Sequence, residues 1–328
     1  MELYYGLWVF DFFRFHKIPL FLQSNFSLYM HLLIYRVVYP ILWCISKLPW
    51  GLFYAFSTGI YYFVYYIIGY RKKAVKENLE LVFPQKTPKE IKKIRKGFYK
   101  HMCDMFLEMI KSISISNEEM IKRFKVTNLD DLKNLEAKGK SMMVFMAHYA
   151  SYEWSNVVDI QTKIQAVGIY KPLGNIYFDR LVQRIRARFG SRLIPNRNAM
   201  KEITKDQKKD GVYMYGLVSD QSPKLHRSQY WTDFMGIKVP TFVGAEVLAK
   251  RLDLNVFYLK VSKIKRGYYE ATFVPITDDP KSCEDYAIVK DYLRMLEEQI
   301  YKEPQYYLWT HKRWKHRNAE KPKGATVD

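Results

Sequence analysis

Short apolar runs alternate with amphipathic stretches along the chain after residue 125, and this alternation constrains the fold more than any other feature. Apolar runs of strand length separated by helical patterns favour a mostly parallel central sheet flanked by helices. We therefore expect an α/β fold. The expected strands are 142–147, 164–170, 212–218, 256–261 and 268–274, and the expected helices are 88–111, 129–138, 153–162, 176–189, 198–209, 243–252 and 284–302.

An uncharged segment precedes this domain. Residues 50–70 carry no charged side chain, and about 20 apolar residues are enough to cross a bilayer. The apolar stretch 28–45 contains Arg36, so we interpret residues 28–70 as one membrane-associated helical module of open topology, with a buried helical hairpin as the alternative. Arg71, Lys72 and Lys73 follow directly, which favours a membrane with this side in the cytoplasm.

The composition predicts an anionic partner. The chain has 53 Lys and Arg against 33 Asp and Glu, a net charge of +20. Nucleic acid, an anionic membrane surface and an acidic carrier protein are the candidate partners. The three cysteines are far apart, and the sequence has no HExxH motif and no phosphate-binding loop, so we expect no metal and no cofactor.

A candidate general base lies at the end of the first expected strand. His148 follows the apolar run 142–147, and Glu153 comes five positions later. On one continuous helix the two side chains would be about 140° apart, so they can meet only if His148 ends a strand and Glu153 opens the next helix. Glu153 would then fix the tautomer of His148 and leave the other ring nitrogen basic. A histidine that merely caps the sheet edge is the alternative.

Two further segments could contact a substrate. Asp220 and Gln221 follow the expected strand 212–218, where open α/β sheets bind ligands, and they are predicted to orient a substrate or shape a pocket. An ordinary turn is the alternative. Near the C-terminal end, cations including Arg313 are interleaved with Trp309 and Trp314, which suits nucleic acid or lipid headgroups. The upstream apolar module favours headgroups.

The stretch from Ala147 to Glu153 resembles the H-x4-D/E motif of the lysophospholipid acyltransferase superfamily. Its surroundings are similar to one branch in particular, the bacterial lipid A late acyltransferases of the lauroyl and myristoyl transferase type, over about residues 71–317. The matching blocks are 77–84, Tyr170-Lys171-Pro172 with Asn175 and Asp179, 186–188, 219–221, Gly236 with 241–244, and 307–315.

This resemblance implies roles for individual residues. His148 would remove the proton from an acceptor hydroxyl, Glu153 would orient His148, and the hydroxyl would attack an acyl thioester directly, without an enzyme nucleophile. Arg188 would stabilise the oxyanion or hold a substrate phosphate, with a solvated helix cation as the alternative. The other residues expected to bind substrate are Lys171, Asp220, Gln221 and Arg313.

The expected function is that of a membrane-anchored O-acyltransferase. It would move a fatty acyl chain from an acyl carrier protein thioester, or from acyl-CoA, to a hydroxyl of a lipid A precursor, an anionic lipid. The alternatives are another acceptor (an aminolipid, a glycerophospholipid or a glycolipid) and a non-enzymatic basic protein that binds membranes or nucleic acid. No nucleic-acid partner is expected for the enzyme.

The resemblance and the charge pattern also imply an organisation along the chain. Residues 1–70 would form the N-terminal membrane-associated segment, residues 71–317 the α/β acyltransferase domain and residues 318–328 a disordered tail. The catalytic domain would lie on the cytoplasmic face of a bacterial inner membrane.

Overall fold

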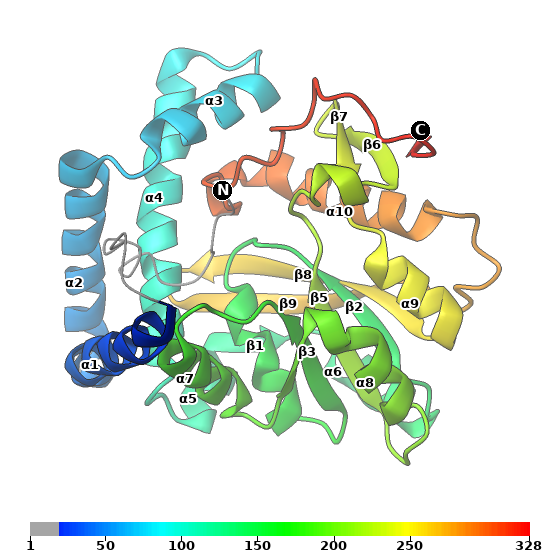
Figure 1. Cartoon of the computed structure of the whole chain (residues 1–328), viewed down its shortest axis with the longest axis horizontal. Coiled ribbons are helices and arrows are strands. Elements are labelled where there is room, and N and C mark those ends of the chain that lie inside the picture. The colour runs from blue at the N-terminus through cyan, green and yellow to red at the C-terminus, as the bar shows by residue number, and fades with distance from the viewer. Residues whose placement is uncertain (1–19) are drawn as a thin grey trace.

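A central sheet of seven strands organises the molecule (Figure 1). The computed structural model describes residues 20–328, with their side chains from Tyr29 onward, so residues 1–19 of the expected segment 1–70 lie outside the described part. The strand order is β1-β9-β8-β2-β5-β3-β4, and every neighbouring pair is parallel except β8 with β9. The expected α/β class, with a mostly parallel sheet flanked by helices, is confirmed.

All five expected strands are present, within a few residues at most of their ends. They are β2 (Met142–Met146), β3 (Gln165–Tyr170), β5 (Tyr213–Val218), β8 (Asn255–Lys265) and β9 (Tyr268–Thr277). The two outer strands of the sheet, β1 (Phe124–Val126) and β4 (Arg192–Pro195), were not predicted, because three or four residues are too short to show a periodic pattern. A second sheet, also not predicted, has the order β10-β6-β7 and contains β6 (Tyr230–Phe234), β7 (Ile237–Thr241) and β10 (Thr326–Val327).

The helices predicted between the strands also form. They are α6 (Leu129–Ala137), α7 (Ile176–Ala187), α8 (Ala199–Asp206), α9 (Gly244–Leu252) and α10 (Ala287–Lys302), and a short α5 (Asn117–Arg123) precedes β1. The segment expected to be a helix at 153–162 is instead the 3-10 helix η3 (Tyr152–Ile160). Val157 and Val158 are β-branched and have a low α-helix propensity, which is consistent with a 3-10 helix in place of the expected α-helix.

The long helix α4 (Pro88–Lys111) forms over the residues predicted for it. Its start is encoded locally. The Thr87 hydroxyl accepts the Glu90 backbone N–H, the Glu90 carboxylate accepts the Thr87 backbone N–H at 2.8 Å, and Pro88 occupies the first helical position. Helix α4 then lies between the sheet and the N-terminal helices (Figure 1).

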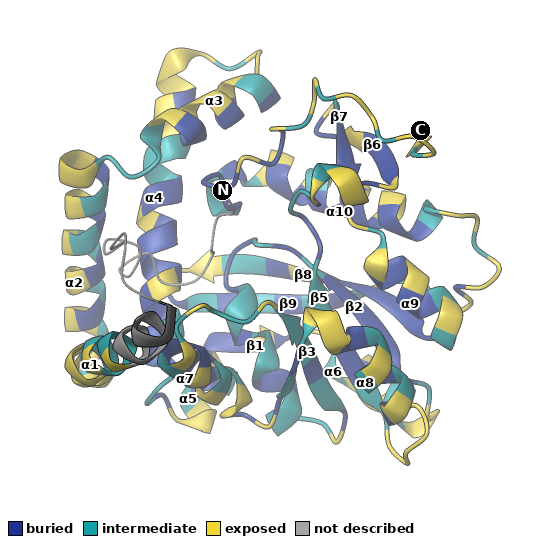
Figure 2. Cartoon of the chain, viewed as in Figure 1, coloured by how far each residue is buried: buried dark blue, intermediate teal, exposed yellow. Residues whose placement is uncertain are grey.

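Two apolar helices form the edge of the molecule beside α4 (Figure 1). Helix α1 (Leu20–Lys47) is followed by α2 (Trp50–Tyr62), which continues as the π-helix η2 (Phe63–Ile68), and α3 (Lys72–Val82) leads into α4. The segments 29–47 and 50–68 are both long and apolar enough to cross a membrane by length and composition alone. Figure 2 shows α2 buried on the side toward α4 and exposed on the other side.

The tip of the β8–β9 hairpin packs against the middle of α2. Gly267 has a φ of +74°, and a Cβ atom at this position would overlap the Tyr54 hydroxyl.

We expect Gly267→Ala to lower the free energy of unfolding by about 2–4 kcal/mol, because the strain of a positive φ adds to the overlap. Denaturant unfolding measures the change. Gly236→Ala is the matched control: Gly236 has a φ of +73° with nothing within 4 Å of an added Cβ, so it should cost only about 1 kcal/mol. Equal costs for the two variants would contradict the close packing.

The segment after Arg317 differs from the disordered tail that we expected. Thr326 and Val327 pair in parallel with Tyr230 and Trp231 of β6, which makes β10 the third strand of the small sheet. The Asp328 carboxylate forms an ion pair with Lys290 at 2.8 Å. These long-range contacts are invisible in the polar composition of the tail.

Candidate active site

His148 lies just beyond the carboxyl end of β2, where the sequence predicted it. The backbone on both sides of it is held by the segment 306–308: the Leu308 N–H donates to the His148 carbonyl at 3.1 Å, and the Ala150 N–H donates to the Tyr306 carbonyl at 3.0 Å. Tyr149 forms an isolated bridge with Tyr307. The loop that carries His148 is therefore fixed by hydrogen bonds to a segment more than 150 residues away in sequence.

The ring of His148 faces Asp220. Its Nδ1 lies 2.7 Å from Asp220 Oδ1. This contact follows from strand register, because β2 and β5 are neighbouring parallel strands in which Met146 pairs with Val218. His148 and Asp220 each come two residues after that pair, so both side chains emerge at the same edge of the sheet. An Nδ1–H donated to Asp220 leaves the lone pair of His148 on Nε2.

Asp220 is held in its ionised form. Its side chain is only 2% exposed, and burial alone would raise its pKa. The hydrogen bond from His148 and the electrostatic interaction with its ring outweigh burial, so the pKa of Asp220 lies below its ordinary value. A buried, ionised acceptor beside Nδ1 is what holds a histidine in one tautomer.

Gln221 and His311 complete the surroundings of this pair. The Gln221 amide nitrogen lies 3.2 Å from His148 Nε2, the ring position that a hydroxyl would need. His311 Nε2 accepts the backbone N–H of Ser222 at 3.2 Å, which holds the turn that carries Asp220 and Gln221. The structure thus brings together three predicted residues: His148, Asp220 and Gln221.

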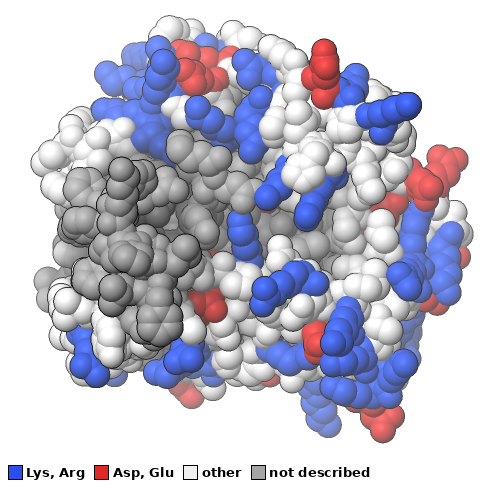
Figure 3. Space-filling view, viewed as in Figure 1, with Lys and Arg blue, Asp and Glu red and all other residues white. Residues whose placement is uncertain are grey.

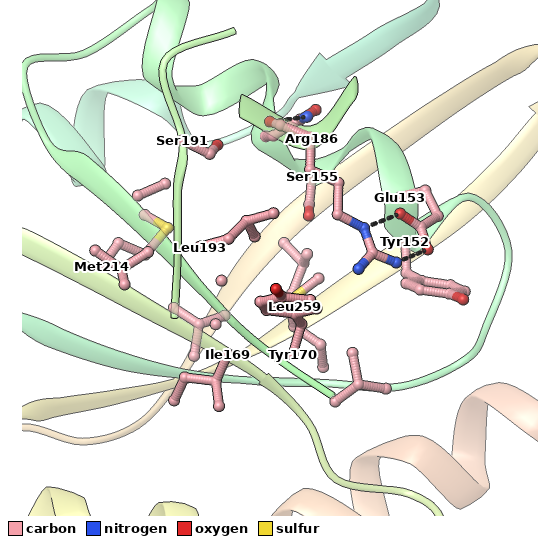
Figure 4. A pocket seen from close by; sticks show the side chains of 18 of the residues that line it. Tyr152, Glu153, Ser155, Ile169, Tyr170, Arg186, Ser191, Leu193, Met214 and Leu259 are labelled. Carbon is pink, nitrogen blue, oxygen red and sulfur yellow. Dashed lines mark hydrogen bonds and ion pairs between the residues drawn. The ribbon is translucent and has the colours of Figure 1, made fainter. Parts of the chain in front are cut away.

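Glu153 does not bond to His148, contrary to the geometry that we expected. Both of its carboxylate oxygens accept from Arg186 of α7, Oε2 from Nε at 2.9 Å and Oε1 from Nη2 at 2.6 Å (Figure 4). Burial alone would raise the pKa of Glu153, but the charge and hydrogen bonds of Arg186 lower it. Glu153 opens the helical segment after β2, as predicted, yet its bidentate ion pair uses the oxygens that would have faced the histidine.

A cavity of about 130 Å³ lies beside this ion pair (Figure 4). Glu153 and Arg186 lie on one side of it, and most of the remaining wall is apolar, as Figure 4 shows. Tyr152 also lines the cavity, and its ring makes an edge contact with the His148 ring at a centroid distance of 5.0 Å. One aromatic ring therefore separates the candidate base from the cavity. The apolar lining is Val144, Met146, Ala166, Val167, Ile169, Leu193, Met214, Val218, Leu259 and Phe273.

The other predicted substrate-binding residues lie elsewhere. Arg188 ends α7, and its Nη1 donates to the Ser112 carbonyl at 2.7 Å. Lys171 is exposed just after β3. Arg313 is completely buried, and its guanidinium donates to the Pro240 carbonyl and to Thr241 Oγ1, both at 2.8 Å. A guanidinium without exposed surface cannot meet a substrate in this conformation, so the arrangement of Arg313 is that of a structural anchor.

Sequence reasoning assigned no role to three residues at the site. Arg186, Tyr152 and His311 were all visible in the sequence, and Arg186 and His311 belong to matching blocks. Their partners could not be read from spacing, because Arg186 is 33 positions from Glu153 and His311 is 89 positions from Ser222. The available signal was the position of Arg186, two residues before Arg188 in the same matching block.

The neutral state of His311 makes stability sensitive to acid. Burial lowers the pKa of His311 to about 3, against 6.5 in an unfolded chain. Between these values the unfolded chain binds a proton that the folded protein does not. The contribution of His311 is therefore complete above about pH 6.5 and is lost as pH falls, by up to about 1.4 kcal/mol for each pH unit.

We expect His311→Gln to flatten the dependence of the free energy of unfolding on pH between about pH 6.5 and pH 3. The glutamine oxygen can still accept the Ser222 N–H, so folding should be retained. Denaturant unfolding at several pH values measures the slope. His226→Gln, at an exposed position, is the control and should leave the slope unchanged. The same slope in wild type and His311→Gln would show that His311 is not buried in the neutral form.

Known proteins resemble this chain over most of its length. The family model of the bacterial lipid A biosynthesis acyltransferases matches residues 24–316, from within α1 to beyond Arg313. The chain is 25% identical over 280 residues to a lipid A biosynthesis palmitoleoyltransferase of Escherichia coli (strain K12), covering 84% of this chain and 89% of the relative. The identity, the aligned length and both coverages are the same for a lipid A biosynthesis acyltransferase of Shigella flexneri. A lipid A biosynthesis lauroyltransferase of Escherichia coli (strain K12) is 22% identical over 281 residues, covering 84% of this chain and 90% of the relative. Since the family model covers most of the sequence, the chain belongs to the bacterial lipid A biosynthesis acyltransferase family.

Proposed function

We propose that this protein transfers a fatty acyl chain from an acyl carrier protein thioester to a hydroxyl of a lipid A precursor, with His148 as the general base. The observation that carries the proposal is the His148–Asp220 pair at the carboxyl edge of the sheet, with Nδ1 2.7 Å from a buried carboxylate and an apolar cavity one ring away. Family membership supports acyl transfer as the reaction class.

The chemistry requires one base and no enzyme nucleophile. His148 Nε2 takes the proton of the acceptor hydroxyl while the oxygen attacks the thioester carbonyl. The tetrahedral intermediate collapses with loss of the thiolate, which takes the proton from His148, so an ester and a thiol replace an alcohol and a thioester. Asp220, as the partner of Nδ1, has the orienting role that the sequence motif gave to Glu153. The Gln221 amide, 3.2 Å from Nε2, has the position that the hydroxyl would take, so we assign Gln221 to acceptor positioning.

The cavity is suited to the acyl chain. Its wall is mostly apolar, so burying a hydrocarbon chain there would remove apolar surface from water. The Glu153–Arg186 ion pair closes one side (Figure 4). We propose that Glu153 acts through Arg186 by fixing η3 and α7 around the cavity. Arg188, beside Ser112, is then left as the candidate for the oxyanion or a substrate phosphate, with Lys171 as an exposed phosphate contact.

The proposed donor and acceptor are both anionic, and the protein has the complementary charge. The net charge is +20, and Lys and Arg outnumber acidic side chains on the face drawn in Figure 3. An acidic carrier protein would be steered toward such a surface. We further propose that the protein is anchored by its N-terminal helices and works at the cytoplasmic face of the bacterial inner membrane, since Arg71, Lys72 and Lys73 follow the apolar helices.

Salt should slow the reaction with a carrier-bound donor. We expect kcat/KM to fall by about tenfold or more between about 0.1 M and 1 M salt, because the Debye length contracts from about 10 Å to about 3 Å over this range. Initial rates with acyl carrier protein thioester measure the effect. A small, uncharged acyl thioester is the control donor and should show little dependence on salt. Equal salt effects on both donors would contradict steering of the carrier.

The experiment that tests the function uses the detergent-solubilised full chain. It is incubated with labelled acyl carrier protein thioester or labelled acyl-CoA and, separately, with a lipid A precursor, a glycerophospholipid, an aminolipid and a glycolipid. We expect acyl transfer from the carrier protein to the lipid A precursor. Transfer only to another lipid would correct the acceptor, a preference for acyl-CoA would correct the donor, and binding of anionic polymers without any transfer would contradict the enzymatic function.

A further inference from the structure

The inner face of helix α2 is bonded to buried acids of α4. Ser57 Oγ donates to Asp104 Oδ1 at 2.6 Å, and the Tyr54 hydroxyl donates to Glu108 Oε1 at 2.9 Å. Asp104 is 1% exposed and Glu108 is completely buried. An α2 helix that left this position to cross a bilayer would leave two buried carboxyl groups without these partners.

A cation also lies against the middle of α2. Arg266, at the tip of the β8–β9 hairpin, donates to the Tyr54 carbonyl and to Thr58 Oγ1 at 3.1 Å each, and it forms an ion pair with Asp104 at 2.6 Å. Tyr54 and Thr58 are close to the centre of the apolar segment 50–68. A helix spanning the membrane would therefore carry a guanidinium and a carboxylate to the bilayer centre, the depth at which charges are least tolerated.

Helix α1 is likewise packed against the catalytic domain along one face. Its residues Ile34, Tyr35 and Val38 contact an apolar cluster on α7, formed by Phe178, Leu181 and Ile185. Figure 1 shows α2 along the edge of the molecule and α1 strongly foreshortened, pointing toward the viewer, so the two helices cross rather than run side by side. Two crossing helices cannot both lie along a membrane normal, whereas both can lie in one plane at this edge.

The outer faces of both helices are apolar and exposed. On α1 the exposed positions Tyr29, Leu33, Val37 and Ile41 are four residues apart and form one stripe. On α2 and η2 the exposed positions are Leu52, Phe56, Tyr62, Phe63, Tyr66, Ile67 and Ile68. We call these two sets the apolar platform. A monomeric protein rarely leaves so much contiguous apolar surface in water.

The charges around the apolar platform match an anionic lipid surface. Lys47 precedes α2, Lys72 and Lys73 follow η2, and Lys96 lies over the ring of Tyr66. Arg36 is exposed on α1 beside Val37, near the middle of that helix. In an in-plane helix such a cation lies at headgroup depth, whereas in a spanning helix it would lie near the bilayer centre.

From these contacts we infer that α1 and α2 lie in the plane of one leaflet of an anionic bilayer and do not cross it, so that the protein is monotopic. The inner faces hold the catalytic domain through Asp104, Glu108 and Arg266, and the apolar platform enters the acyl region of the near leaflet. This inference rests on the membrane location of the proposed function and goes beyond it by specifying one-sided insertion. It does not depend on the acyl-transfer chemistry.

Depth-dependent quenching distinguishes the two arrangements. An environment-sensitive fluorophore is attached to the introduced cysteine of Leu52→Cys, Phe56→Cys or Ile67→Cys, with the native Cys44 and Cys283 replaced by serine and the buried Cys103 left in place. The full chain is reconstituted into vesicles of phosphatidylethanolamine and phosphatidylglycerol that contain lipids with a nitroxide either near the headgroup or near the chain end. Leu52 and Ile67 are about 22 Å apart along the helix, so a spanning helix would place them near opposite surfaces, with Phe56 about 6 Å deeper than Leu52.

We expect all three positions to be quenched more strongly by the shallow nitroxide, to within about twofold of one another. Val247→Cys is the control and should not be quenched, because Val247 is exposed on α9, which lies at the edge of the molecule opposite α2 in Figure 1. Strongest quenching of Phe56 by the deep nitroxide, with Leu52 and Ile67 near opposite surfaces, would overturn the inference in favour of a spanning helix. Absence of quenching at all three positions would overturn it in favour of a platform covered by protein.

A second measurement does not need labels. The double variant Leu33→Lys and Leu52→Lys should reduce the fraction of protein that floats with the same vesicles by about fivefold or more, while circular dichroism stays unchanged. Val247→Lys is matched in type and exposure and should float as wild type. Because flotation and quenching need no substrate, an inactive protein that passes both tests would refute only the proposed reaction, and an active one that fails them would refute only the one-leaflet arrangement. Undiminished flotation of the double variant would contradict the platform.

Discussion

Replacing His148 with alanine is expected to lower kcat by about 10²- to 10⁴-fold, because the acceptor hydroxyl would lose the group that takes its proton in the transition state. The His148 side chain is 15% exposed, so its removal should change the free energy of unfolding by no more than about 1–2 kcal/mol. Single-turnover transfer of a labelled acyl chain from saturating donor measures the effect on the chemical step.

The control for this variant separates catalysis from folding and binding. His148→Ala should float with anionic vesicles as wild type, and its KM for the donor should change by less than about threefold. Tyr152→Phe keeps the aromatic ring against the cavity and should retain most of the activity. Near-normal turnover by His148→Ala would refute the assignment of His148 as base, whereas loss of folding would have to be excluded by circular dichroism before the rate is interpreted.

Asp220→Asn is expected to have the second-largest effect, a fall in kcat of about 10- to 1000-fold. An asparagine amide can donate to Nδ1, which stabilises the tautomer that carries its proton on Nε2 and therefore has no lone pair for the hydroxyl. The charge that favours a protonated His148 during the reaction is also lost. Initial rates at saturating donor, together with denaturant unfolding, measure the loss of activity separately from stability.

Glu153→Gln is the comparison that decides between the two carboxylates. It leaves the His148–Asp220 contact intact and removes the negative partner of Arg186, so it should lower the free energy of unfolding by about 1–3 kcal/mol and kcat by less than about tenfold. The reverse order, with Glu153→Gln much less active than Asp220→Asn, would return the orienting role to Glu153, as the H-x4-E spacing predicts. Equal and large effects on kcat would mean that both carboxylates act on His148.

The fold class could be predicted because the main strands are long enough to show their pattern. Strands β2, β3, β5, β8 and β9 are apolar runs of five or more residues, and their order along the chain between helical patterns is typical of a parallel sheet. The strands that were missed have two to five residues, and β10 lies in a polar tail that we expected to be disordered. The pairing of β1 with β9 and of β10 with β6 joins residues 145 and 96 positions apart, which leaves no local signal.

The candidate site also contains residues that the sequence predicted and residues that only the structure placed. His148, Asp220 and Gln221 were predicted from their place after apolar strands, since carboxyl ends of parallel strands share one edge. The choice of Asp220 over Glu153 as the partner of His148 depends on the pairing of Met146 with Val218 and on the capture of Glu153 by Arg186. Arg313, expected to contact substrate, is buried by the small sheet, whose existence the sequence did not reveal.

By itself, the sequence determined the α/β class, the apolar N-terminal helices, the basic charge and a histidine at a strand end, because each depends on residue type and on spacing within one segment. Only the tertiary structure decided which carboxylate faces that histidine, where Arg313 lies and which side of α2 forms hydrogen bonds with charged side chains. These outcomes depend on strand register and on ion pairs between residues 33 to 162 positions apart, such as Glu153–Arg186 and Asp104–Arg266. Hydrogen bonds and ion pairs act over a few ångströms in space, so the folded backbone, and not the distance along the chain, selects the partner of each charge.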